Sequence, residues 1–289
     1  MKMKARCVPC ILNRVVYESE LVTKDKSELE NIMKNAVKEM ARLYGSNLSS
    51  AEIATRVHGV VYKLLQKDPY KELKEKSNEV AIKMLPKAKK IIESSNNRLE
   101  AAMLISIAAN SIDFGISGSA SSPQELEAKF EDYVRQGIYH NDFKKIESYL
   151  KGDILYFTDN CGEVVFDKLV CKELKKYDVR ITLIPKKYPI LTDATYEDVK
   201  KLGFDEIVDE IITTGSFSVG IDFNSMSEKL KDELENASII LSKGMANYEA
   251  FSEANYKPIA YLLRVKCKSI GEDMGLPTGI NAIKLYEKN

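Results

Sequence analysis

The segment that decides the fold is residues 154–174, which read ILYFTDNCGEVVFDKLVCKEL. It opens with four apolar residues, Ile154 to Phe157, and continues through a short polar cluster. Apolar residues at helical spacing then run from Val164 to Leu174. A buried strand that passes through a polar turn into a helix is typical of the βα unit of a parallel sheet. This segment therefore predicts an α/β fold.

The same alternation continues along the second half of the chain. Apolar runs typical of strands and segments typical of helices follow one another at residues 179–184, 196–202, 207–212, 226–234, 237–241, 247–254 and 259–263. This spacing is typical of a Rossmann-like, mostly parallel sheet of five or more strands. We expect the α/β domain to occupy residues 151–289.

The first half of the chain shows the periodicity of helices instead. A capping-box sequence at Ser49 precedes residues 53–65, where apolar side chains recur every three or four positions. Residues 99–112 are apolar almost all round, which predicts a central helix. Pro86 is expected to kink or split another helical segment. We predict a helical N-terminal region over residues 1–150, either a separate domain or part of one body with the sheet.

Composition argues against several classes of protein. The 289 residues include 43 Lys and Arg and 43 Asp and Glu, so the chain lacks the basic surplus of a nucleic-acid-binding protein. No apolar run approaches the roughly twenty residues of a membrane helix. The first residues contain no apolar secretory segment, and five unevenly spaced cysteines do not resemble a secreted disulfide framework. We expect a cytoplasmic protein without nucleic-acid or membrane partners.

Four polar clusters stand where an apolar strand ends and a helix begins. They are Thr158–Glu163, Thr192–Thr195, Ser242–Asn247 and Arg264–Lys266. Because the carboxyl ends of parallel strands open onto one crevice, these clusters are expected to meet in space. Their carboxylates, carboxamides and ammonium groups suit a hard cation and a phosphate.

Asp159 and Asn160 directly precede a helix, and this position allows two interpretations. Asp and Asn side chains commonly cap a helix by accepting its free backbone N–H groups. Their oxygens also suit Mg²⁺ or Mn²⁺. Asp193 favours the metal, because Thr195 already offers the next helix a cap and a third oxygen would complete one face of an octahedral site. The alternative for Asp193 is an exposed loop carboxylate.

Two lysines follow later strands. Lys243 and Gly244 begin a short helix, where an ammonium group and backbone N–H groups can hold a phosphate, and Lys266 follows the next strand. Either lysine could instead be a solvated surface charge. Asn110 and Asp113, at the end of a very apolar helix, are expected to brace the site or cap their own helix.

Cys7 and Cys10 have the spacing of a metal or redox motif. A zinc site would need two more ligands, and the sequence offers neither a second such pair nor a nearby pair of histidines. Two packed thiols are therefore favoured over a disulfide or a shared metal.

Together these motifs resemble the damage-control phosphatase family, which includes proteins called acidic residue methyltransferases. The residues that carry the resemblance are Asp159-Asn160-x-Gly162-Glu163, Asp193 in a proline-led loop, Lys243-Gly244-x-x-Asn247-x-Glu249, Lys266-Cys267, Cys7-x-x-Cys10 and Asn110-Ser111-Ile112-Asp113-Phe114. The cysteine pair is similar to that of the prokaryotic branch. Eukaryotic members carry an Arg-Thr-x-Lys motif, of which only Lys266 has a counterpart here.

The resemblance implies a phosphatase that depends on a divalent metal (Mn, Mg, Co or Ni) and hydrolyses small phosphoesters, such as sugar phosphates or damaged phosphometabolites. It implies that the metal ligands are Asp159, Asn160 and Asp193. It also implies that the substrate contacts come from Asn160, Asn247, Lys266 and the backbone around Lys243, Gly244 and Met245.

For the reaction we expect metal-assisted attack by water, with Lys243 and Lys266 stabilising the transition state. Asp159 could instead be a nucleophile that forms an aspartyl-phosphate. Haloacid-dehalogenase-type phosphatases place a second Asp two residues later, where this chain has Cys161, so water is favoured. Two other functions stay open, an S-adenosylmethionine-dependent carboxyl methyltransferase and a non-catalytic metabolite- or nucleotide-binding protein. The methyltransferase would need a Gly-rich turn where only Gly162 stands.

Overall fold

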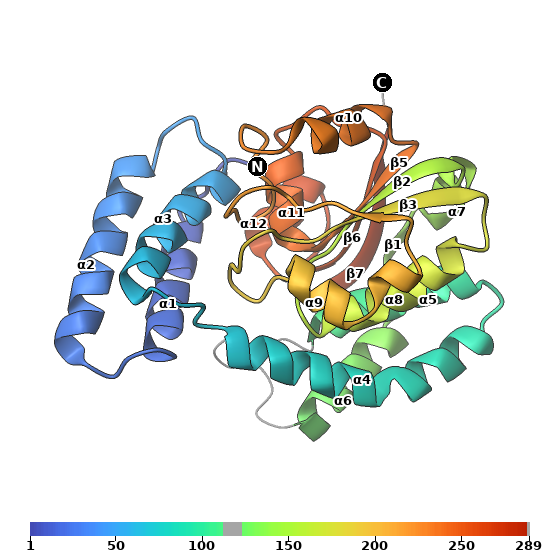
Figure 1. The fold of residues 1–289 in the computed structure, drawn as a ribbon, viewed down its shortest axis with the longest axis horizontal. Helices are drawn as coiled ribbons and strands as arrows, with labels where there is room; N and C mark the ends of the chain where they lie inside the picture. The colour runs from blue at the N-terminus through green and yellow to red at the C-terminus, as the bar shows by residue number, and fades with distance from the viewer. Residues whose placement is uncertain (112–122, 288–289) are drawn as a thin grey trace.

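A seven-stranded sheet forms the centre of the computed structural model, which describes residues 1–111 and 123–287 (Figure 1). The strand order is β1-β7-β6-β5-β2-β3-β4. The strands are β1 (His140–Asn141), β2 (Gly152–Phe157), β3 (Val179–Ile184), β4 (Glu210–Ile211), β5 (Ile239–Lys243), β6 (Ile259–Val265) and β7 (Ile280–Tyr286). All neighbouring strands are parallel except β6 and β7. The α/β prediction with a mostly parallel sheet is confirmed.

Twelve α-helices surround this sheet in the part of the chain that is described. They are α1 (Cys7–Glu20), α2 (Lys26–Leu43), α3 (Ser50–Leu65), α4 (Lys71–Glu93), α5 (Arg98–Ala108), α6 (Pro123–Arg135), α7 (Phe143–Ile146), α8 (Glu163–Leu174), α9 (Tyr196–Lys201), α10 (Glu228–Asn236), α11 (Gly244–Phe251) and α12 (Lys268–Met274). Short 3₁₀ turns lie at Ala109–Ser111, Glu147–Tyr149 and Phe204–Glu206.

The central strand β2 is apolar because both of its faces are covered. Ile154 and Tyr156 pack into a core with α4, α5 and α8. Leu155 and Phe157 point to the other face and pack with α10, α11 and α12. Side chains alternate between the two faces of a strand, so a strand buried on both sides reads as a continuous apolar run. This explains why residues 154–157 carry such a clear signal.

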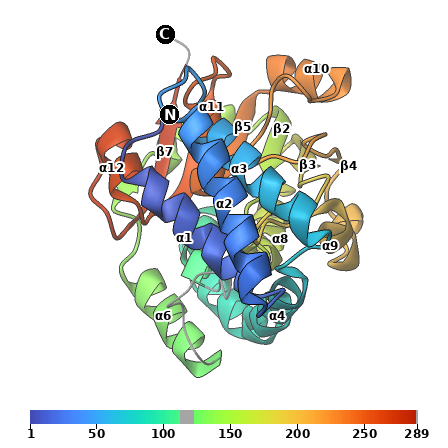
Figure 2. The same ribbon diagram turned by 90° about the vertical axis from the view of Figure 1, so that its left-hand side faces the viewer.

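Helices α1, α2 and α3 form a separate layer with a core of its own. Val15, Ile32, Val57 and Val61 are fully buried within that core. Figures 1 and 2 show the three helices side by side at one flank of the sheet. The capping box expected at Ser49 is present at the start of α3. The domain division at residue 150 stays a prediction, although β1 shows that the N-terminal part contributes a strand to the sheet.

Two local predictions need correction, and two strands were not predicted. Helix α4 runs through Pro86 without a break, so the proline does not split it, and the alternative of a kink stays a prediction. The face of α4 that includes Ala81 and Ala88 is buried in the core, and this packing compensates for the one backbone hydrogen bond that proline removes. The strand expected at residues 207–212 shortens to β4, because the backbone N–H groups of Ile207 and Val208 donate to the Phe204 carbonyl and continue the preceding 3₁₀ turn. Strands β1 and β7 were not predicted.

No helix within residues 1–111 and 123–287 has the length and apolar character needed to span a bilayer.

Candidate active site

The candidate site lies beyond the carboxyl end of β2, where Asp159 is a buried carboxylate and not a helix cap. Helix α8 begins at Glu163, and its N-cap residue, Gly162, has a φ of +82° and no side-chain cap. The Gly162 N–H instead donates to the Asn78 side chain at 2.6 Å. Asp159 is only 6% exposed. Its carboxyl group therefore remains available for another task.

The loop after β3 brings Asp193 to the same place. Asn160 and Asp193 form an antiparallel backbone bridge. The Ala194 N–H donates to the Asp159 carbonyl at 2.8 Å, and the Thr192 hydroxyl donates to Asn160 Oδ1 at 2.6 Å. Asp193 is 5% exposed, so it is not an exposed loop carboxylate. The expected capping box at Thr195, completed by Asp198, is present at the start of α9. The structure thus brings the predicted oxygen ligands together.

Gly244, at the end of β5, makes room for the Asp159 carboxylate. Its φ is +76°, and a Cβ placed on it would lie 2.0 Å from Asp159 Oδ2 and 2.1 Å from Asp159 Cγ. Real Cβ atoms essentially never approach another heavy atom to less than 3.0 Å. A glycine is therefore required at this position if Asp159 is to keep its conformation.

Lys243 lies in the interior and does not reach the surface. Its side chain is 0% exposed, and its Nζ forms ion pairs with Glu163 and, at 2.8 Å, with Asp167. Tyr156 and Ser106 also donate hydrogen bonds to Asp167. The surface-charge alternative for Lys243 is wrong. The ammonium group is engaged by two carboxylates, so it offsets part of their negative charge from the interior of the protein.

Lys186 is a second buried cation, and it contacts Asp193. The two side chains lie 3.4 Å apart, and Lys186 Nζ also donates to the Gly220 carbonyl. Lys186 is only 2% exposed. It therefore connects the loop that carries Asp193 to the loop that follows β4.

Asn110 braces the cluster from the end of α5. Its Nδ2 donates to Asp159 Oδ2 at 3.2 Å and to Glu163. Lys266 donates from Nζ to the Asn110 carbonyl at 2.7 Å, and its side chain is exposed. The bracing role expected for Asn110 agrees with these contacts, whereas Asp113 lies outside the described residues.

Asn247 and Met245, two predicted substrate contacts, make structural contacts here. Asn247 Nδ2 donates to the carbonyls of Thr158 and Lys243, at 3.0 Å and 2.8 Å, and so joins the ends of β2 and β5. Its Oδ1 is buried and has no hydrogen-bond partner among the described residues. The Met245 side chain packs against the apolar core on the α11 face.

Burial and mutual repulsion disfavour the charged form of these carboxyl groups. Burial, followed by the charges of Glu163 and Asp193, raises the pKa of Asp159 well above its ordinary value. Burial also raises the pKa of Glu163 and of Asp193, despite the nearby ammonium groups. A carboxyl group under these conditions gains stability from a proton or from an added cation.

The charges of the cluster leave room for a divalent cation. The buried side chains in this contacting set are Asp159, Glu163, Asp167, Asp193, Lys186 and Lys243. If all six are ionised, two negative charges are not balanced by a contact within the set. Across residues 1–111 and 123–287, no three His, Cys, Asp or Glu side chains are grouped to hold a metal. A metal would thus need the Asn160 oxygen beside the two aspartates.

Asn160 is the one ligand whose present hydrogen bonds oppose that use. Its Nδ2 donates to Asp159 Oδ2 at 2.7 Å, while its Oδ1 accepts from Thr192. A half-turn of the amide would exchange the two ends and direct the oxygen at the carboxylates. The residue types and their positions therefore fit a hard cation, provided that this amide turns.

The two cysteines of the N-terminal motif lie at the start of α1. Cys7 Sγ lies 3.7 Å from the hydroxyl of Ser269, at the start of α12. All five cysteines of the chain carry free thiols. Cys7 is partly buried and Cys10 is exposed, so the packing of two thiols stays a prediction.

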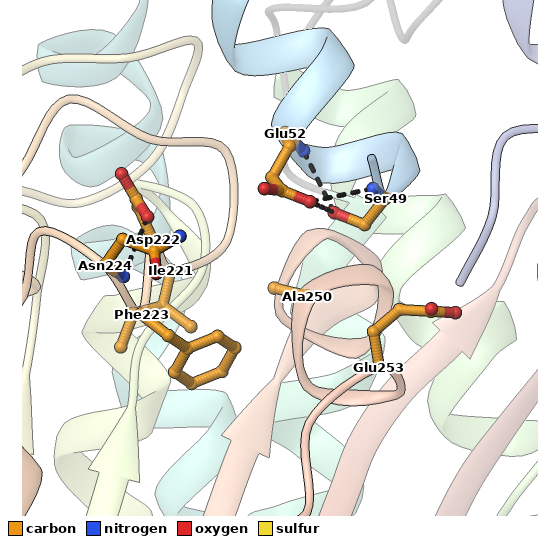
Figure 3. Close-up of a pocket in the computed structure, with 8 residues that line it drawn as sticks. All are labelled: Ser49, Glu52, Ile221, Asp222, Phe223, Asn224, Ala250 and Glu253. Carbon is orange, nitrogen blue, oxygen red and sulfur yellow. Dashed lines mark hydrogen bonds between the residues drawn. The ribbon is translucent and has the colours of Figure 1, made fainter. Parts of the chain in front are cut away.

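A separate small cavity of about 170 Å³ lies between α3, α11 and the loop at residues 221–224 (Figure 3). Its acidic groups are already engaged. Glu52 completes the cap of α3, Asp222 accepts hydrogen bonds from its own loop, and Glu253 pairs with the N-terminal amino group and Lys2. This cavity contains none of the residues of the candidate site.

Three residues of the cluster were missed as site residues. Glu163 belongs to a motif of the resemblance but was not predicted to act in the site. Asp167 lies one turn later on the same side of α8, and this spacing could have revealed the pair. Lys186 follows β3 directly, as Asp159 follows β2, and the same rule of strand ends could have found it.

Comparisons with known proteins match the whole chain. A sequence model of the family described as the damage-control phosphatase ARMT1-like domain matches residues 3–281. A damage-control phosphatase of Archaeoglobus fulgidus is 38% identical over 99% of this chain and all of its own length. A damage-control phosphatase of Pyrococcus horikoshii is 30% identical, with 96% of each chain covered. The crystal structure of a DUF89 family protein from Pyrococcus horikoshii matches with a TM-score of 0.89 and 30% identity, covering 100% of both chains.

Proposed function

Because the chain belongs to the ARMT1-like damage-control phosphatase family, we propose that it hydrolyses small phosphoesters at the Asp159–Asn160–Asp193 site with the help of a divalent metal ion. The substrates we propose are sugar phosphates or damaged phosphometabolites. The observation that carries the metal is the buried pair of aspartates, whose cluster has more negative than positive charge. Oxygen ligands, and the two negative charges that stay unbalanced when all six groups are ionised, suit Mn²⁺, Mg²⁺, Co²⁺ or Ni²⁺.

Asp159, Asn160 and Asp193 would hold the ion. When bound, a divalent cation offsets the charge of the phosphate and makes a bound water more acidic. The protein holds Asp159 in place before substrate arrives. Gly244 leaves the space that the Asp159 carboxylate occupies, and Asn110 holds the same carboxylate by a hydrogen bond. Such a preset ligand costs little rearrangement during the reaction, whereas Asn160 must first turn its amide.

We assign different tasks to the two lysines. Lys266 is exposed and lies beside Asn110, so its ammonium group is available to a phosphate. Lys243 is buried against Glu163 and Asp167, so we propose that it positions the cluster and does not touch the substrate. This revises the direct catalytic role expected for Lys243.

Attack by water remains our preferred reaction. Cys161 stands where phosphatases of the haloacid-dehalogenase type, which form an aspartyl-phosphate, place a second Asp. The absence of that Asp favours water over Asp159 as the nucleophile. Mass spectrometry of the protein after trapping with a phosphate mimic would reveal phosphoryl-Asp159 if this preference is wrong.

The test is a screen of phosphoester substrates against the four metal ions. We expect Asp159→Asn and Asp193→Asn each to lose at least about a hundredfold in kcat/KM and to bind Mn²⁺ more weakly in calorimetric titrations. Asp209→Asn is the matched control, because Asp209 is a carboxylate paired with Lys175 away from the site. Full activity in both site variants would remove the proposed site.

The same titration with S-adenosylmethionine tests the methyltransferase alternative, for which clear binding is required. The expected cytoplasmic location also stays a prediction.

A further inference from the structure

A groove of about 760 Å³ lies between α3 and the loops that follow β3 and β4. Its apolar lining includes Val60 and Tyr62 from α3, Pro189 from the first loop and Phe217 from the second. This volume and this lining are typical of pockets that bind small molecules. The residues proposed for hydrolysis do not include any of these four.

The first loop connects the groove to the candidate site. The Leu191 N–H donates to the Tyr62 hydroxyl at 2.8 Å, and Leu191 adopts the left-handed conformation, with a φ of +48°. Two residues span at most about 7 Å of chain. The hydroxyl of Tyr62 therefore lies within roughly 10 Å of the Asp193 backbone. A phosphate at Asp193 and a ring in the groove can belong to one small molecule.

The second loop makes the same connection independently. The Val219 N–H donates to the Thr55 hydroxyl of α3 at 2.9 Å, which holds Phe217 against the groove. One residue further, the Gly220 carbonyl accepts from Lys186, which pairs with Asp193. Both loops thus begin at the groove and end at Asp193 or its partner.

Aromatic faces and basic side chains define what the groove would accept. The rings of Tyr62 and Phe217 meet edge to face, with centroids 5.2 Å apart. The Tyr62 hydroxyl is already engaged, so its ring and not its hydroxyl is offered to a ligand. Such surfaces favour planar or apolar groups.

The charges around the groove favour an anion. Arg56 and Lys63 line it and are exposed. Its two acidic residues are paired, Glu39 with Arg42 at 2.6 Å and Asp68 with Lys74 at 2.6 Å. The charge available to a ligand is therefore positive, which suits a substrate that carries a phosphate.

We propose that this groove binds the leaving group of the substrate, and that, of the two classes proposed above, the substrate is a phosphometabolite whose leaving group is planar and aromatic or compact and apolar, and not a sugar phosphate. This inference rests on the proposed function, because it places the phosphate at Asp193. It predicts that a bare polyol phosphate, such as glycerol phosphate, uses only part of the available binding surface.

The test compares phenyl phosphate and naphthyl phosphate, whose leaving groups differ mainly in apolar area. In the unmodified protein with Mn²⁺, we expect naphthyl phosphate to have the lower KM, by roughly tenfold, since the second ring buries additional apolar surface. Phe217→Ala and Tyr188→Ala should reduce this preference to less than about threefold, mainly through KM. Tyr188 also lines the groove and is 47% exposed, so its replacement does not endanger folding.

Tyr139→Ala is the matched control, because Tyr139 is 66% exposed and does not line the groove. It should keep the full preference and hydrolyse glycerol phosphate as well as the unmodified protein does. A preference for naphthyl phosphate that survives both groove variants overturns the inference, as does equal KM for the two aryl phosphates in the unmodified protein.

A binding titration separates this inference from the proposed function. Naphthyl phosphate is titrated into Asp159→Asn, with and without Phe217→Ala or Tyr188→Ala. If no metal supports hydrolysis in the unmodified protein, the proposed function fails, but binding weakened about tenfold by either groove variant still supports the groove. Equal binding by all of these proteins overturns the inference about the groove, even if the phosphatase activity is found.

Discussion

Gly244→Ala should disable the site by displacing one carboxylate. The added Cβ would lie 2.0 Å from Asp159 Oδ2, and contacts below 3.0 Å essentially do not occur, so the carboxylate must move by about 1 Å or more. A displacement of this size costs about a hundredfold in rate. The backbone contributes a second effect, because a φ of +76° costs an L-residue about 1–2 kcal/mol.

The two effects can be measured separately with a second glycine. Gly45 has a φ of +83°, and a Cβ added there would have no atom within 4 Å, so Gly45→Ala carries the backbone cost alone. Thermal unfolding should show a loss of roughly 2–4 °C per kcal/mol for both variants. Only Gly244→Ala should also lose about a hundredfold in kcat/KM for phenyl phosphate with Mn²⁺, and bind Mn²⁺ more weakly.

The reasoning is refuted if folded Gly244→Ala keeps its activity within about threefold of the unmodified protein. That result would mean that Asp159 can move without consequence and hence does not act in the reaction. An equal loss of activity in Gly45→Ala would also refute it, because the loss would then follow from backbone strain alone.

Three further predictions concern charged side chains. Lys243→Met should lower the free energy of unfolding by about 3–5 kcal/mol in urea titrations, because it leaves two buried carboxylates unpaired; a loss below about 1 kcal/mol would contradict the buried pairing. Burial is the first cause of the raised pKa of Asp159, and this raised pKa means that the metal-free protein loses stability as pH rises. The increase in Tm given by Mn²⁺ should therefore be larger at pH 7.5 than at pH 5.5. A smaller increase at pH 7.5 would contradict this prediction. Burial raises the pKa of Asp142, but hydrogen bonds from Lys145, the Leu285 N–H and His140 lower it overall. The stability that this group contributes is therefore present at neutral pH and is lost as pH falls through the lowered pKa. Asp142→Asn should cost about 1–2 kcal/mol at pH 7 in the same titrations, and the cost should shrink steadily as pH falls below about 4; a cost that does not change with pH would contradict it.

The sequence predicted the fold best where burial leaves a continuous signal. Strand β3 was expected at its observed residues. Both of its faces are covered, so apolar residues can follow one another without alternating with polar ones. Strand β7 was missed although Ile280, Ala282 and Leu285 are apolar. Strand β7 runs antiparallel to β6, whereas the alternation of strands and helices before it predicts a parallel neighbour.

The candidate site was predictable in its location and less so in its contacts. The rule that parallel strands open onto one crevice was enough to bring Asp159 and Asp193 together. The partner of Lys243 depends on the rotation of α8 over the sheet, which turns Glu163 and Asp167 towards β5. That rotation is set by packing of the whole core, so it cannot be predicted from the residues on either side of Lys243 in the sequence.

The tight fit of Gly244 under Asp159 has a consequence for how the protein responds to temperature. A buried carboxylate that packs against Gly244 and accepts hydrogen bonds from Asn110 and Asn160 has little side-chain entropy left to lose when a ligand arrives. Heating normally penalises association through such lost freedom, and here most of that loss occurs once, when the chain folds. Affinity for a cation should accordingly decline little with warming until the protein itself unfolds.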